Sequence, residues 1–156
     1  MSVTVKASDP AQFLALVPRL LGCTPRNSLV LVPMARGRSL GAMRLDLPPE
    51  EHNETVASSA IGMVCRIGET DALIAVVYTD AAIEGGADLP GAGLVAALRK
   101  KADAGGLRLL DALTVASDGW GSHDDPALPP GGRPLRALRV RGATAAALAS
   151  AGMPAP

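Results

Sequence analysis

The fold of this chain is decided by residues 17–32, VPRLLGCTPRNSLVLV. The first six residues close an amphipathic helix, and Gly22 is a natural stop because glycine adopts the left-handed conformation without strain. Pro25 then turns the chain into Ser28–Met34, a continuous apolar run that is typical of a strand buried on both faces. A helix that leads at once into a buried strand predicts an α/β architecture.

The helix that ends at Gly22 has a clear predicted start. Asp9 is a good N-cap, Pro10 suits the first helical position, and Gln12 stands where a capping box places its second partner. Pro18 interrupts the pattern, because proline lacks the N–H of an internal helical bond, and predicts a kink or two short helices. The apolar face of the helix is formed by Phe13, Leu16, Val17, Leu20 and Leu21.

The next strand is predicted to form an antiparallel hairpin with Ser28–Met34. After a turn at residues 36–38, Leu40–Leu47 alternates between two faces. Met43, Leu45 and Leu47 share one face, and Arg44 and Asp46 share the other.

Strand and helix patterns then alternate as in parallel crossover units. We expect a short edge strand at Val3, Val5 and Ala7, a helix from Pro48 to about Arg66, a strand at Leu73–Thr79, a helix at about Gly91–Ala104 and a strand at Leu107–Val115. These elements predict one three-layer α/β domain over residues 1–117, with a mixed, roughly five-stranded sheet and helices on both faces. Residues 118–156 are predicted to be a Pro/Gly-rich loop and a tail, with a short helix at Ala143–Ala151.

Composition bounds the possible functions. The chain has 156 residues, of which 48% are hydrophobic and only 2% aromatic, and its formal net charge is zero. The neutral charge argues against a nucleic-acid partner, which needs phosphate neutralisation, and leaves little repulsion against self-association. No apolar run approaches the ~20 residues of a membrane span, and no signal peptide is visible, so we expect a cytoplasmic protein. Cys23 and Cys65 are expected to be buried, reduced thiols.

Several motifs resemble a family of actinobacterial proteins described only as a domain of unknown function. They are the VPRLLG segment, the PRNSLV strand at residues 25–30, RLDLP at residues 44–48 and VYTD at residues 77–80. LLDAL at residues 109–113 and PPGGRPL at residues 129–135 are similar too. The resemblance implies a chain equivalent to the N-terminal half of the usual family member, and it carries over no catalytic residue.

The first candidate site is the end of the strand Leu73–Thr79. Thr79 and Asp80 stand at its carboxyl end, and Gly85 and Gly86 follow in the loop. Ligands of open α/β sheets bind beyond the carboxyl ends of strands, and small residues let a ligand approach the backbone. The alternative is that Asp80 caps a turn. No phosphate-binding glycine motif accompanies these residues, so no cofactor is predicted.

Two further groups are candidates for ligand binding. Arg44 and Asp46 share a strand face, on which they either meet a partner or remain solvated. Trp120 and His123 lie in the Gly-rich segment that follows the last predicted strand, where a solvated loop is the alternative. No metal site and no catalytic nucleophile are predicted, because no adequate set of ligands and no nucleophile elbow is present.

The motifs name no activity. The leading hypothesis is a non-catalytic binding or assembly module that forms a homo-oligomer, with the apolar positions of Leu135–Leu148 reaching a neighbour, and a different protein as a possible further partner. The alternative is a small enzyme or small-ligand binder, with its site at the strand end near Asp80 and the Trp120 loop.

Overall fold

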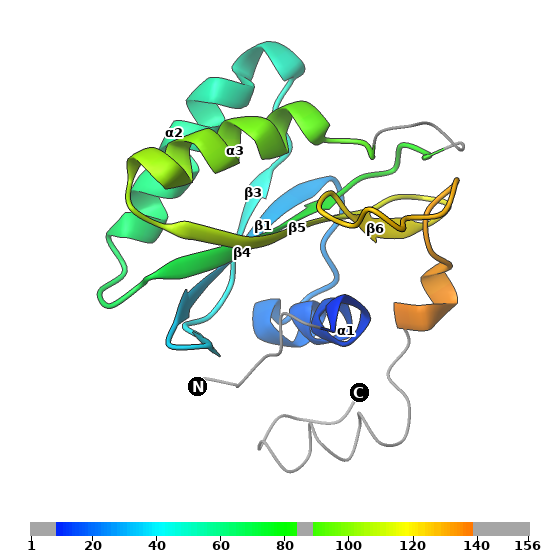
Figure 1. The fold of residues 1–156 in the computed structure, drawn as a ribbon, viewed down its shortest axis with the longest axis horizontal. Helices are drawn as coiled ribbons and strands as arrows, with labels where there is room; N and C mark the ends of the chain where they lie inside the picture. The colour runs from blue at the N-terminus through cyan, green and yellow to red at the C-terminus, as the bar shows by residue number, and fades with distance from the viewer. Residues whose placement is uncertain (1–8, 84–88, 139–156) are drawn as a thin grey trace.

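A mixed sheet lies between two helical layers in the computed structural model, which describes residues 9–83 and 89–138 (Figure 1). One face of the sheet is covered by α1 (Pro10–Leu21), and the other by α2 (Asn53–Cys65) and α3 (Ala92–Ala104). This arrangement confirms the predicted α/β domain with helices on both faces.

The sheet has the strand order β2–β1–β4–β5–β6, and β3 pairs with β1 beside β2. β4 and β5 are parallel and are joined through α3, whereas the other neighbouring pairs are antiparallel. The strands are β1 (Ser28–Ala35), β2 (Arg38–Ser39), β3 (Met43–Asp46), β4 (Ala72–Tyr78), β5 (Arg108–Val115) and β6 (Trp120–Ser122). Two short 3-10 turns, η1 (Glu50–His52) and η2 (Leu135–Leu138), complete the described elements.

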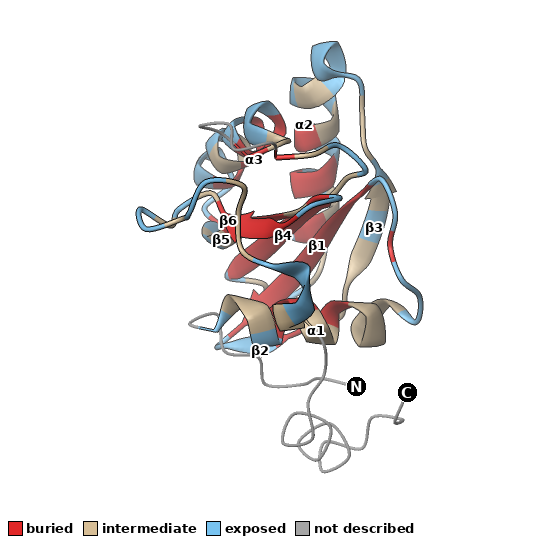
Figure 2. Ribbon diagram, turned by 90° about the vertical axis from the view of Figure 1, so that its right-hand side faces the viewer, coloured by how far each residue is buried: buried red, intermediate tan, exposed pale blue. Residues whose placement is uncertain are grey.

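The two central strands are buried along almost their whole length, as Figure 2 shows for β1 and β4. Alternate side chains of β1 enter different cores: Leu29 and Leu31 pack beneath α2 and α3, and Val30 and Val32 pack against α1. Each buried Val or Leu stabilises the fold by roughly 1.5–3 kcal/mol relative to an exposed one. Both faces of the central strands therefore need a helical cover.

Pro33 stands inside the buried strand β1 without disrupting its pairing. Its carbonyl accepts a hydrogen bond of 2.8 Å from the N–H of Leu40, so the backbone of Pro33 faces β2 rather than β4. The missing N–H therefore faces the break between β2 and β3, and the ladder to β4 is complete. The prediction of one continuous strand over Leu40–Leu47 is wrong here. The chain leaves the strand conformation between Ser39 and Met43, and Gly41 in this break has a φ of 120°.

α1 begins and ends as predicted. The side chain of Asp9 accepts a 3.1 Å hydrogen bond from the backbone N–H of Gln12, and Gly22 ends the helix with a φ of 78°. The N–H of Gly22 donates to the carbonyl of Pro18. α1 runs through Pro18 as one helix, so the expected division into two helices does not occur.

The segment after Ser117 is more ordered than its Pro/Gly content indicates. Trp120–Ser122 forms β6, which extends the sheet beyond β5, and Trp120 also makes a β-bridge with Arg133. The prediction of a loop is wrong there. A Cβ at Gly119 would lie 2.5 Å from the carbonyl oxygen of Gly131, and one at Gly132 would lie 2.9 Å from that of Trp120. These glycines allow two backbone stretches to approach closely.

Three other expectations have different outcomes. Both cysteines are free, but Cys23 and Cys65 are exposed, so their predicted burial is wrong. Cys23 follows the end of α1, and Cys65 is the last residue of α2; neither position faces a core. The short strand expected at Val3, Val5 and Ala7 and the helix at Ala143–Ala151 lie outside the described residues.

Replacement of Gly22 by valine is expected to destabilise the fold by about 1–2 kcal/mol, because a β-branched residue is strained in the left-handed conformation. A Cβ added at Gly22 would meet no heavy atom within 4 Å, so backbone strain is the only cost. Thermal unfolding measures the loss. Gly68→Val is the matched control, because its Cβ also meets open space but its φ is not positive. Equal losses in the two variants would contradict this account.

Candidate functional site

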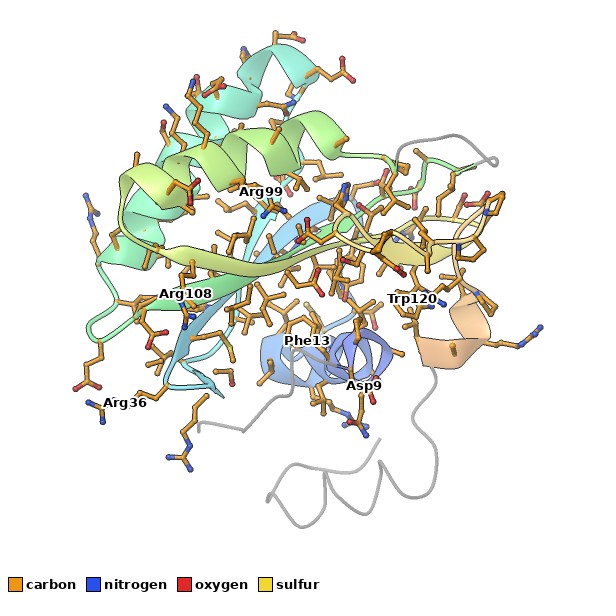
Figure 3. All side chains as sticks on the ribbon, in the orientation of Figure 1. Asp9, Phe13, Arg36, Arg99, Arg108 and Trp120 are labelled. Atoms are coloured by element: carbon orange, nitrogen blue, oxygen red, sulfur yellow. The ribbon has the colours of Figure 1, made fainter. Side chains whose placement is uncertain are left out.

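A cavity of about 680 Å³ opens between the start of α1, strands β5 and β6, and the segment that leads to η2. Figure 3 marks Asp9 at the start of α1 and Trp120 beside β6, and both residues line the cavity. Its lining combines apolar side chains with carboxylates and one arginine. The full lining is Asp9, Pro10, Ala11, Leu110, Asp111, Trp120, Ser122, Asp124, Asp125, Pro126, Arg133, Pro134 and Ala137.

A β-bulge at Leu110 directs Asp111 toward the α1 side of the sheet. β4 residues Leu73 and Ile74 pair with Leu109 and Asp111, so Leu110 is the extra residue. Leu109 packs in the core under α2 and α3, whereas Leu113, four residues on, packs in the core against α1. Strict alternation would put both on one face, so the bulge changes the phase. Asp111 consequently shares the face of Leu113 and lines the cavity.

Asp111 is a half-buried carboxyl group whose two oxygens differ in the hydrogen bonds that they accept. Its Oδ1 accepts hydrogen bonds from the hydroxyl of Ser122 at 2.6 Å and from the N–H of Ala112 at 2.8 Å. Its Oδ2 accepts none from the described residues. Burial raises the pKa of Asp111, and the Asp124 carboxylate adds to the rise, while the Ser122 and Ala112 hydrogen bonds and the Arg99 charge oppose it.

Two ion pairs hold the outer wall of the cavity. Asp124 pairs with Arg99 of α3 at 2.8 Å, and its N–H donates to the Ser122 hydroxyl at 3.1 Å. Asp125 pairs with Arg133, whose hydrogen bond is the main cause that lowers the pKa of Asp125. Ser122 thus connects the wall to Asp111 through one hydroxyl group.

Trp120 is the one predicted site residue that lines this cavity. It is only 4% exposed, and its indole N–H donates to the carbonyl of Pro134 at 3.1 Å. The backbone of Trp120 pairs with Val115 on one side and with Arg133 on the other. Its ring is therefore held firmly between the sheet and the segment that closes the cavity.

His123 lies outside the cavity and forms a structural bridge. Its Nε2 is 2.7 Å from the Thr114 hydroxyl, which donates its proton to the carbonyl of Pro90 at 2.8 Å. Because the hydroxyl has a single proton, Nε2 carries the hydrogen and donates to Thr114. Thr114 thus connects β5 with the loop before α3 and, through His123, with the segment after β6.

Thr79 lies in a second cavity, of about 440 Å³, between the end of β4 and the start of α3. Asp80 is not in the lining of either cavity. Its carboxylate accepts from the side-chain amide of Asn27 at 2.9 Å, and its N–H donates to the Asn27 side-chain oxygen at 3.0 Å. This reciprocal pair joins β4 to the loop before β1. The expected ligand role of Asp80 stays a prediction, and Gly85 and Gly86 lie outside the described residues.

Arg44 and Asp46 lie apart from both cavities, on the exposed face of β3. They pair with each other at 2.8 Å, and the Asp46 side chain is 86% exposed. These two residues therefore share no cavity with Asp80. His123 does not share the cavity that Trp120 lines either.

Asp111 was missed in the sequence analysis. The signal that could have found it is a single carboxylate inside the apolar strand LLDALTV, residues 109–115. No group of three or more His, Cys, Asp or Glu side chains suited to a metal ion occurs within residues 9–83 and 89–138.

Residues 10–155 match the family model described as Domain of unknown function (DUF4192). The chain belongs to this family. The match covers most of the chain and confirms the expected resemblance to a domain of unknown function. Comparisons of this DUF4192 domain with the curated proteins and with the solved structures gave no match. In the part of the chain that the structure describes, no helix is both long and apolar enough to cross a membrane.

The Asp111→Asn variant of the DUF4192 domain is expected to gain stability relative to the wild type as the pH rises above the ordinary carboxyl pKa. Below the ordinary value of 3.8, the carboxyl group is protonated in both folded and unfolded chains. As the pH rises, the unfolded chain loses its proton first because the folded-state pKa is raised, so the wild type loses stability until the pH passes that raised pKa. Asparagine does not titrate and avoids this loss.

Thermal unfolding at several pH values measures the difference between variant and wild type. Asp46→Asn, at an exposed carboxylate on β3, is the matched control for the loss of one carboxylate. A difference for Asp111→Asn that stays constant with pH would contradict the assignment of a buried, titrating carboxyl group.

Proposed function

We propose that this DUF4192 domain binds a small organic cation in the cavity around Asp111. The observation that supports the proposal is a half-buried carboxylate beside a cavity of about 680 Å³, whose Oδ2 accepts no hydrogen bond from the described residues. Cavities of roughly 300–1,000 Å³ with a few well-placed polar groups are typical small-molecule sites.

The charges of the lining favour a cation over an anion. Asp124 and Asp125 each have an arginine partner, whereas Asp111 and Asp9 have none among the ion pairs of the described residues. An ammonium or guanidinium group beside Asp111 would offset the desolvation of its carboxylate. The apolar body of the same ligand would contact Leu110, Trp120 and the start of α1.

Benzylamine, benzyl alcohol and benzoate are a suitable probe series, because they share a ring and differ in charge. Trp120 is the only tryptophan of the chain and lines the cavity, so its fluorescence reports binding there. We expect the cation to change this fluorescence at the lowest concentration, the alcohol to bind more weakly and the carboxylate not to bind. Asp111→Asn should weaken binding of the cation at least about tenfold, which is the effect of one lost charged hydrogen bond.

The pH dependence provides a second criterion. Affinity for benzylamine should fall as the pH decreases through the raised pKa of Asp111, because protonation removes the negative charge. Asp46→Asn should bind the cation like the wild type. Equal binding of the three probes, or unchanged binding by Asp111→Asn, would overturn the proposal.

We propose as a second function that the domain self-associates. The supporting observation is the outer edge of β3, for which no strand of the described residues provides a partner. The described start of the tail, Leu135–Leu138, contacts α1 of the same chain, and Leu138 packs into the core beside it. The sheet edge therefore supports this proposal better than the tail does.

Sedimentation velocity of the full chain at micromolar concentration tests self-association. We expect a dimer whose population rises with concentration. A monomer across the whole concentration range would overturn this second function and leave the ligand proposal intact.

A further inference from the structure

Two residues of β3, Arg44 and Asp46, direct their backbone N–H and C=O groups to the side of the strand opposite β1. The N–H of Leu47 donates to the carbonyl of Asn27, in register with the pairs Leu45–Leu29 and Met43–Leu31. Backbone groups of alternate residues in a strand point to opposite sides. Arg44 and Asp46 therefore direct their N–H and C=O groups away from β1, where no described residue bonds to them.

The two faces of β3 differ in chemistry. Arg44 and Asp46 project from one face and are exposed. Met43, Leu45 and Leu47 project from the other, where they pack against the core beneath α2 and α3 but stay partly exposed. β3 stands at the rim of the sheet in Figure 2. The edge thus offers backbone groups that no described residue pairs with, a charged face and an incompletely covered apolar face.

We propose that β3 pairs antiparallel with β3 of a second copy of this chain, centred on Leu45. The inference rests on the proposed self-association and names its surface. In this register Arg44 stands opposite the partner's Asp46, and Asp46 stands opposite the partner's Arg44. Both pairs consist of outward-facing residues, so each exchanges two backbone hydrogen bonds, and the two sheets become one continuous sheet.

Charge selects this register over its neighbours. A shift by one residue would oppose outward-facing with inward-facing groups and exchange the faces. A shift by two in one direction places Arg44 against the partner's Arg44, and in the other direction Asp46 against the partner's Asp46. Like charges directly opposite are destabilising, whereas opposite charges contribute about 0.2–1 kcal/mol per pair. The Arg44–Asp46 spacing is therefore self-complementary only around Leu45.

The apolar face agrees with the same register. Leu45 meets its own copy as a close, non-hydrogen-bonded pair, and Met43 stands opposite the partner's Leu47. All three side chains are half-buried in the single chain. Pairing would cover apolar surface on one side of the seam and add cross-strand partners to the Arg44–Asp46 ion pairs on the other.

A charge-exchange experiment with full-length chains tests this interface. Arg44→Asp alone and Asp46→Arg alone each place like charges opposite one another in a homodimer. We expect each variant to dimerise at least about tenfold more weakly than the wild type in sedimentation velocity. An equimolar mixture of the two variants restores opposite charges in both cross-strand pairs, so it should recover the wild-type dimer population.

The double variant Arg44→Asp/Asp46→Arg is the matched control. It remains self-complementary and should dimerise like the wild type, with circular dichroism confirming its fold. A dimer that is insensitive to both single changes, or a mixture that stays monomeric, would overturn this interface while self-association itself stands. A monomeric wild type would overturn both. A folded but monomeric double variant would likewise contradict the register.

Discussion

β1 and β4 carry apolar side chains on both faces, and the rest of the structure depends on the need to bury them. Neither face can contact water, so the chain must supply a helix layer on each side. α2 and α3 cover one face, and α1 with η2 covers the other. The side chains that fill both cores are mostly aliphatic, with the buried rings of Phe13 and Trp120 and the partly buried ring of Tyr78 near α1. Close packing of many branched side chains replaces the aromatic clusters of other small domains.

The candidate site depends on one irregularity in this sheet. If Leu110 held a regular strand position instead of a bulge, Asp111 would share a face with Leu109 and enter the core beneath α2 and α3. A carboxylate there would be costly to ionise and would have no access to a ligand. The bulge instead places Asp111 beside Ser122 and the cavity. A local change of phase in one strand thereby moves this carboxyl group from a core position to the lining of the cavity.

The features of the fold that depend on local sequence patterns could be predicted from the sequence. The cap at Asp9, the stop at Gly22 and the doubly buried strands are visible because spacing and residue type determine them. The site was not predictable in the same way. A bulge depends on how two strands register, and β6 is too short to show an alternating pattern. Asp80 lies outside the cavity at the end of β4 and pairs with Asn27, a contact between segments far apart in the chain that no local pattern reveals.

The close approach at Gly119 and Gly132 changes what the segment after Ser117 can be used for. A stretch rich in proline and glycine resembles a linker, which an engineer would choose for inserting a tag or for joining new termini. Tolerance of insertion depends on the burial and hydrogen bonding of the backbone rather than on composition. Here the backbones of Trp120 and Arg133 bond to each other in both directions, and the glycines leave no space between the two stretches. The exposed turn at Arg36 and Gly37, between β1 and β2, is the better place to open the chain.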